Sequence, residues 1–177
     1  MSLNNTSGQG PFIFTLREDL CNLTQSAKKH EVDLHGGFAI DSQKDGHIYY
    51  GMPGYGIMKI EPDLSKQDVI SLPNELAPIN FHSTVIGDFE GKRRLILSAN
   101  ADEMVVVLTL DGAIDFMLPR PVFEEYKDQD APYKPTDTVL INDELFIADG
   151  YGSNYILSAN VTTKEWTGIF GGKTEIA

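Results

Sequence analysis

Two segments of the sequence place a tyrosine between glycines, directly after a short apolar run. Tyr55 follows IYY in GMPGYG, and Tyr151 follows LFI in DGYG. Flanking glycines let the backbone turn sharply and leave the phenol accessible. Such a phenol can act as a base where a cation lowers its pKa from about 10; otherwise the aromatic ring simply covers a tight bend. Tyr151 is therefore a candidate catalytic residue, and Tyr55 a candidate binding residue.

Two histidines, His35 and His82, stand at the beginning of similar apolar runs. Neutral imidazoles bind zinc, which takes three or more protein ligands. We name both histidines as candidate zinc ligands, with the remaining ligands coming from a second copy of the chain. The alternative interpretation is that each imidazole forms a hydrogen bond with the backbone of a neighbouring structural unit.

Two aspartates, Asp137 and Asp149, bracket the apolar runs that precede Tyr151. Both are candidate binding residues. Aspartate side chains at strand starts and bends also accept hydrogen bonds from nearby backbone N–H groups. In that interpretation Asp137 stabilises the start of a strand and Asp149 fastens the bend.

These residues recur because the chain contains three copies of one pattern. Each copy has four short apolar runs separated by polar turns: FAI, IYY, IMKI and VISL; TVI, LIL, MVVVL and IDFML; TVL, LFI, NYIL and WTGIF. Ile48, Leu95 and Leu145 occupy equivalent places, 47 and 50 residues apart. Four short strands in about 40–50 residues are typical of propeller blades. The sequence predicts an all-β propeller segment of three four-stranded blades, whose inner strand starts face a central channel.

Three blades make half of a six-bladed ring. Because repeats bury their faces against neighbours, we expect either a dimer of two half-rings or a fragment of a longer chain. We assign residues 31–177 to the blades and residues 1–30 to an N-terminal segment. That segment would hold an edge strand at PFIFTL and a short helix in REDLCNLTQSAKKH.

The charge and composition of the chain argue against several classes of partner and site. The net charge of −12 argues against nucleic acid and anionic membranes, since both need a basic face. A single cysteine, Cys21, excludes an internal disulfide and a cysteine-based zinc site. No apolar run approaches the ~20 residues of a membrane helix, and no charged-then-apolar signal region begins the chain. We expect a soluble protein whose compartment the sequence does not specify.

The repeat pattern over residues 33–173 resembles the NHL-type six-bladed propellers. KPTDTVL…LFIADGYGSNYI is similar to a blade of the peptidyl-α-hydroxyglycine amidating lyases, and NFHSTVI is similar to the segments that carry their zinc-binding histidines. Members of that family cleave the C–N bond of a hydroxyglycine-extended peptide at a zinc ion. The resemblance implies that His82 binds zinc, that Tyr151 is catalytic, and that Thr136 and Asp137 form the Pro-Thr-Asp corner.

The family's arginines are missing at two places. SNYI stands where the family has Asn-Ser-Arg-Ile, and the first copy has no arginine in its second strand or the following bend. We therefore expect a scaffold that binds a small molecule, a peptide or a protein at the mouth of its channel. The alternative is a zinc-dependent lyase or hydrolase related to the amidating lyases.

Overall fold

A computed structural model describes residues 6–17, 23–33, 36–128 and 130–173. Three four-stranded antiparallel sheets, blades 1 to 3, follow one another along this part of the chain, and each strand pairs with its neighbour in sequence. Blade 1 contains β3 (Ala39–Ile40), β4 (Ile48–Met52), β5 (Gly56–Ile60) and β6 (Gln67–Ile70); blade 2 contains β7 (Ser83–Phe89), β8 (Lys92–Ala99), β9 (Met104–Thr109) and β10 (Ile114–Leu118); blade 3 contains β11 (Asp137–Ile141), β12 (Glu144–Ala148), β13 (Tyr155–Asn160) and β14 (Glu165–Gly171). The prediction of three four-stranded blades is confirmed.

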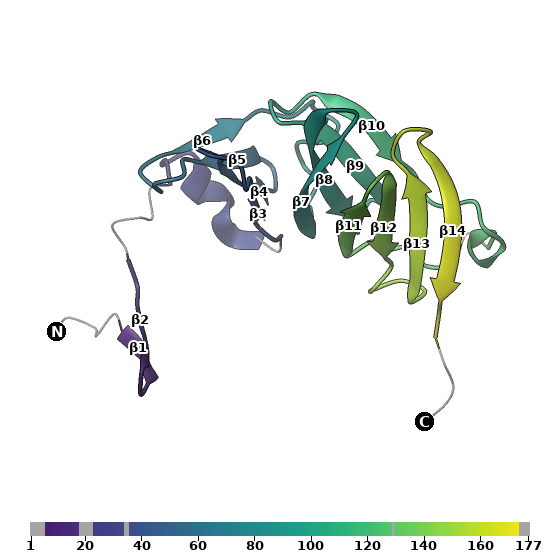
Figure 1. Cartoon of the computed structure of the whole chain (residues 1–177), viewed down its shortest axis with the longest axis horizontal. Helices are drawn as coiled ribbons and strands as arrows, with labels where there is room; N and C mark the ends of the chain where they lie inside the picture. Colours follow the sequence, from purple (N-terminus) through teal and green to yellow (C-terminus); the bar gives the residue numbers. More distant parts are fainter. Residues whose placement is uncertain (1–5, 18–22, 34–35, 129, 174–177) are drawn as a thin grey trace.

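The blades lie side by side in an arc, with their first strands together on the inside (Figure 1). β3 and β11 both contact β7, so the inner strands of all three blades meet. The outer strands β6, β10 and β14 lie on the convex side. This is the wedge-like arrangement of propeller blades around an axis, and it places the starts of the inner strands on one central region.

Tight turns connect the strands. Glu90 and Gly91 join β7 to β8 in two residues, and both have positive φ (51° and 67°). A two-residue hairpin of type I′ requires this backbone, which matches the twist of the strands it joins. Asp45, in the predicted Asp-Gly turn between β3 and β4, also has positive φ. Local turn chemistry therefore agrees with the repeat pattern.

Blade 2 is buried on both faces, and this explains its unbroken apolar runs. Along β9, Val106 and Leu108 pack toward blade 1, whereas Val105 and Val107 pack toward blade 3. A strand covered on both sides needs apolar residues at successive positions, so period-two alternation disappears. An ion pair between Arg93 of β8 and Asp41, just after β3, adds a polar link between blades 1 and 2.

The two ends of the arc differ. On the outer face of blade 1 a 3-10 helix, η2 (Ala27–Asp33), covers the middle strands: its Ala27 is fully buried in one cluster with Tyr50, Met52 and Met58, while Phe38 and Ile40 beside them stay exposed. The outer face of blade 3 keeps apolar side chains in contact with solvent, as described below. A second short 3-10 helix, η3 (Glu124–Tyr126), lies in the loop between blades 2 and 3.

The N-terminal prediction holds only in part. Residues 12–15 of PFIFTL form a strand, β2 (Phe12–Thr15), but it pairs with β1 (Thr6–Gln9) in a separate hairpin that projects away from the blades (Figure 1). The helix expected in residues 17–30 appears instead as η2, which overlaps only the end of that stretch; residues 18–22, including Cys21, lie outside the described part. Among the described residues no helix has the length and apolar character to cross a membrane.

Candidate functional site

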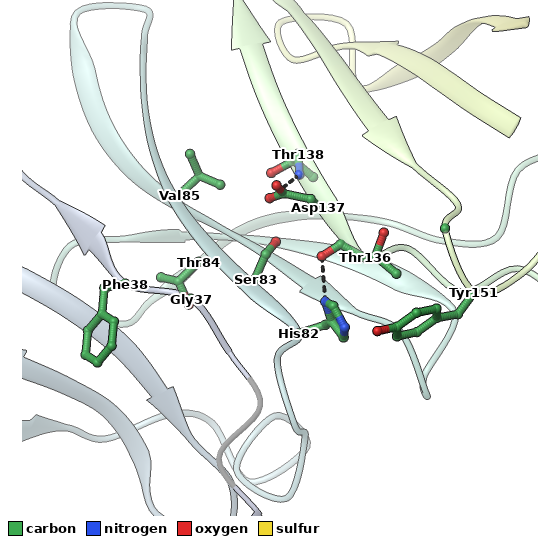
Figure 2. A pocket seen from close by; sticks show the side chains of 11 residues that line it. Gly37, Phe38, His82, Ser83, Thr84, Val85, Thr136, Asp137, Thr138 and Tyr151 are labelled. Carbon is green, nitrogen blue, oxygen red and sulfur yellow. Dashed lines mark hydrogen bonds between the residues drawn. The ribbon is translucent and has the colours of Figure 1, made fainter. Parts of the chain in front are cut away.

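A pocket of about 610 Å³ lies where the inner strands begin. Its walls come from the start of β7 (residues 82–85), the start of β11 (residues 136–138), the bend after β12 (residues 150–151) and the segment before β3 (residues 37–38). Figure 2 shows these side chains around the opening. All three blades contribute, so the pocket depends on their arrangement around the axis.

The imidazole of His82 is fixed by the next blade. Its Nδ1 lies 2.8 Å from the backbone oxygen of Thr136 (Figure 2). A carbonyl oxygen only accepts, so Nδ1 donates and carries the proton, and Nε2 is the acceptor nitrogen of the neutral ring. This is the backbone hydrogen bond that the sequence offered as the alternative to metal binding. Metal-binding histidines are often oriented by the same kind of bond, so it is compatible with both roles.

Tyr151 lies directly beside His82. The two ring centroids are 5.0 Å apart with an interplanar angle of 86°, an edge-to-face contact. The Tyr151 side chain is 60% exposed, and its hydroxyl points toward the pocket region in Figure 2. The structure thus brings together two predicted site residues that are 69 positions apart in the sequence.

Gly150 allows the bend after β12 to approach this site. A Cβ at Gly150 would lie 2.6 Å from Oγ1 of Thr136, closer than side-chain carbons come to such atoms. The hydroxyl of Thr136 in turn donates to the backbone oxygen of Ala148 (3.2 Å). The glycine before Tyr151 is therefore required by close packing against the residue that holds His82.

Most polar groups in the pocket are hydroxyls. Ser83, Thr84 and Thr138 line its walls; the Ser83 hydroxyl donates to Ser98 in the same blade (2.9 Å), whereas the Thr84 and Thr138 hydroxyls are buried. Asp137 supplies the carboxylate among the lining residues; it is exposed, and its Oδ1 accepts the backbone N–H of Thr138 (2.8 Å). The predicted contact at the strand start is thus present, and the carboxylate still lies at the pocket. The sequence did not single out the hydroxyl residues, although they directly follow His82 and Asp137.

Asp149, which the sequence named as a candidate binding residue, has a structural role instead. It is fully buried and is not among the pocket residues. Its carboxylate accepts hydrogen bonds from the Tyr126 hydroxyl (2.7 Å) and from the backbone N–H groups of Lys134 and Ser153 (2.6 Å each). A Cβ at Gly152 would lie 2.0 Å from its Oδ1. Asp149 therefore fastens the bend that carries Tyr151 to the loop between blades 2 and 3.

Arg120 organises the same loop, and the sequence analysis missed it. Its Nη2 donates to the backbone oxygens of Tyr126 (3.4 Å) and Asp128 (2.9 Å), while its Nη1 pairs with Glu103 (3.2 Å). One guanidinium offers five N–H donors in a fixed plane, which suits several acceptors at once. No local pattern marks this arginine, because its partners lie 6 to 17 positions away.

Tyr133, buried beneath this loop, gives the chain a pH dependence. Burial raises the pKa of Tyr133 above its ordinary value of about 10, and the Asp149 and Glu103 carboxylates add to the shift. Above pH 10 the unfolded chain loses this proton while the folded chain keeps it, so the free energy of unfolding falls by about 1.4 kcal/mol per pH unit from this group. Below pH 10 the contribution is constant.

Tyr133→Phe is therefore expected to be at least as stable as the original chain at pH 7, and its advantage should grow above pH 10. Among the described residues the Tyr133 hydroxyl has no hydrogen-bond partner, so its removal leaves none unpaired. Urea unfolding at pH 7, 9, 10.5 and 11.5 measures the difference. The other tyrosines titrate in both proteins and cancel. Parallel stability curves over this range would contradict the expectation.

The remaining predicted residues lie elsewhere. The Tyr55 hydroxyl contacts Ser26 Oγ (2.7 Å), and its ring stacks on His30 (5.2 Å between centroids), so Tyr55 packs against the N-terminal segment. Hydrogen bonds from Ser26 and Thr24 lower the pKa of Tyr55. His35 lies outside the described residues. Within the described ranges no three His, Cys, Asp or Glu side chains are close enough to hold a metal ion.

Comparisons with known proteins identify no family for this chain, but they find a solved structure that is similar to it. No protein-family model matches the chain, and no curated protein does. Among solved structures, BamB from Moraxella catarrhalis is similar with a TM-score of 0.38 and 12% sequence identity, over 76% of this chain and 52% of that one. The chain is a three-bladed propeller segment. This assignment rests on its own sheets, and the chain spans about half the length of the BamB structure.

Proposed function

We propose that this chain is an NHL-type binding scaffold that holds a short peptide or another small polar molecule in the pocket between its inner strands. The observation that carries the proposal is the pocket itself, which draws walls from all three blades. Its volume of about 610 Å³ falls within the range of small-molecule sites, roughly 300–1,000 Å³. A scaffold of this kind uses rigid strands to place side chains that come from distant parts of the sequence.

The lining indicates the chemistry of the ligand. Tyr151 offers an exposed aromatic ring, and the hydroxyls of Tyr151 and Ser83 can both donate and accept hydrogen bonds. Among the described lining residues Asp137 is the acidic group, so an anionic ligand would be repelled. The pocket suits a neutral or cationic molecule that combines a flat apolar part with amide or hydroxyl groups. A short peptide segment has all of these.

Binding can be tested with tripeptides, acetylated at the N-terminus and amidated at the C-terminus, followed by ¹H–¹⁵N NMR. We expect the amide signals of Ser83, Thr138 and Gly150 to shift. Tyr151→Ala should weaken binding at least tenfold, since aromatic anchors carry much of the energy of a site. Tyr55→Ala is the matched control, because Tyr55 follows the same motif in blade 1 but lies outside the pocket. Unchanged affinity in Tyr151→Ala would contradict the proposal.

A zinc-dependent lyase related to the amidating lyases is the second candidate. The contact between His82 and Tyr151 favours it, because the resemblance assigns these two residues to zinc binding and catalysis. His82 fits as one ligand, since its Nδ1–H is already oriented by Thr136. Zinc would polarise the substrate and activate its hydroxyl in such a site. The described residues supply part of the ligand set only, and SNYI lacks the family's arginine.

The two candidates separate in one experiment. Zinc titration by calorimetry, followed by an assay for glyoxylate release from a peptidyl-α-hydroxyglycine, tests the enzyme. Tight zinc binding that is lost in His82→Ala, together with product release, would favour the lyase. Peptide binding that is unchanged by a zinc chelator would favour the scaffold.

A further inference from the structure

The outer face of blade 3 is an apolar surface with no cover in the part of the chain that the structure describes. We call it the blade-3 face and define it by Val139, Ile141, Phe146, Ile156 and Phe170. The strand register places these side chains on one side of the sheet, opposite the side that packs on blade 2. Val139, Ile141 and Phe170 are 51–54% exposed. Contiguous apolar patches of this kind mark interaction sites.

A hollow of about 170 Å³ opens on this face. Val139, Phe146, Ala148 and Ile156 line it, and Asp137 and Thr138 border it. Apolar cavities of about 150 Å³ hold one benzene molecule. The hollow therefore has room for a single phenyl ring and is too small for a folded element.

The β1–β2 hairpin is a second apolar surface of the same chain. Phe12, Ile13, Phe14 and Leu16 are 59–71% exposed, and in Figure 1 the hairpin extends away from every blade. Side chains alternate along a strand, so Phe12 and Phe14 lie on the same side of β2. An aromatic side chain buries roughly 150–250 Å² when it is covered. Phe12 and Phe14 therefore form an apolar surface on one side of the hairpin, and a partner that covers this surface would stabilise the hairpin.

Charge favours contact between these two surfaces. Residues 6–16 contain no charged side chain, whereas Asp137, Glu144 and Glu165 lie on the same side of blade 3 as its apolar residues. Contact between two blade-3 faces would bring two acidic rims together, and like-charge contacts across an interface cost several kcal/mol. An uncharged hairpin meets the face without this cost. In a chain with a net charge of −12, charge repulsion therefore favours contact between the hairpin and the blade-3 face over contact between two blade-3 faces.

We propose that the β1–β2 hairpin of one copy docks on the blade-3 face of a second copy, with Phe12 or Phe14 in the hollow. Within one chain the hairpin lies at the blade 1 end of the arc and the blade-3 face at the other end, so the contact forms between copies (Figure 1). Reciprocal docking of two chains uses each surface once and closes a twofold dimer. The outer face of blade 1 also exposes Phe38 and Ile40, but it is a weaker partner because η2 already covers its middle strands at Tyr50, Met52 and Met58. This inference does not depend on the proposed ligand binding.

The test is a pair of charge substitutions in the 177-residue chain, Phe14→Asp and Val139→Asp, measured by sedimentation equilibrium. The original chain should have twice the mass of one copy. Each variant should weaken dimerisation at least tenfold, because a carboxylate would be buried without a partner. In an equimolar mixture the hairpin of Val139→Asp meets the face of Phe14→Asp, so one of the two contacts stays intact. The mixture should therefore dimerise more tightly than either variant alone and less tightly than the original chain.

Met117→Asp is the control, because Met117 is also exposed but lies on β10, outside both surfaces. It should leave the dimer unchanged, and circular dichroism should show that all three variants remain folded. A monomeric original chain would overturn the proposal. So would dimers that Val139→Asp abolishes but Phe14→Asp does not, because the blade-3 face would then contact another surface of the second copy. A mixture that associates no more tightly than either variant alone would also contradict it.

Discussion

Replacing Asp149 with alanine is expected to lower the free energy of unfolding by about 4 kcal/mol, the largest effect of any single substitution considered for this chain. The change leaves three donors without their acceptor: the Tyr126 hydroxyl and the backbone N–H groups of Lys134 and Ser153. A buried donor that loses its partner costs about 1–3 kcal/mol. The bend that carries Tyr151 and the loop between blades 2 and 3 would separate.

Urea unfolding at pH 7, followed by circular dichroism, measures this loss. Asp143→Ala is the matched control, since Asp143 is an exposed aspartate in the β11–β12 turn of the same blade. Its substitution should change stability by less than about 0.5 kcal/mol. If Asp149→Ala lost less than about 1 kcal/mol, the carboxylate would not be what holds the bend.

Leu157→Ala is expected to cost about 3 kcal/mol. Leu157 is fully buried on the side of β13 that packs on blade 2, in one cluster with Ile96 and Leu145. Large-to-small changes in such a core cost about 2–5 kcal/mol, because the removed atoms leave a cavity. The measurement is the shift in urea midpoint, with an unchanged slope as the sign that the native state is intact.

Val139→Ala tests the opposite side of the same blade. Val139 is about half exposed, so its truncation should cost less than about 0.5 kcal/mol at low protein concentration. At high concentration the cost should grow if the blade-3 face binds a second copy, because binding stabilises the folded form by mass action. Equal losses for Leu157→Ala and Val139→Ala would contradict the assignment of an inner and an outer face.

The strands could be predicted because their signal is local and repeated. Apolar runs such as MVVVL and LFI recur in the same order with turn residues between them, and each strand pairs with its neighbour in the chain. The N-terminal segment has no second copy to align with. The hairpin between Thr6 and Thr15 and the position of η2 therefore could not be read from periodicity.

Only the principal residues of the site could be predicted from the sequence. His82 and Tyr151 stood out by type and position, and the structure places them in contact. Their orientation depends on the Thr136 carbonyl, which is 54 positions from His82. Every residue type has a backbone carbonyl, so no sequence pattern predicts which carbonyl accepts the His82 hydrogen bond. The roles of Asp149 and Arg120 likewise depend on where a long loop folds back.

The strand order within each blade has a consequence for how the chain folds. Because every sheet is a meander, its ladders close short loops, and short loops cost little entropy to form. Each blade can then assemble as a unit and gain its stability from the blade beside it. Hydrogen exchange should reflect this: amides of β8 and β9, flanked by a blade on either side, should exchange slowest, and those of blade 3, which has one such neighbour, earlier.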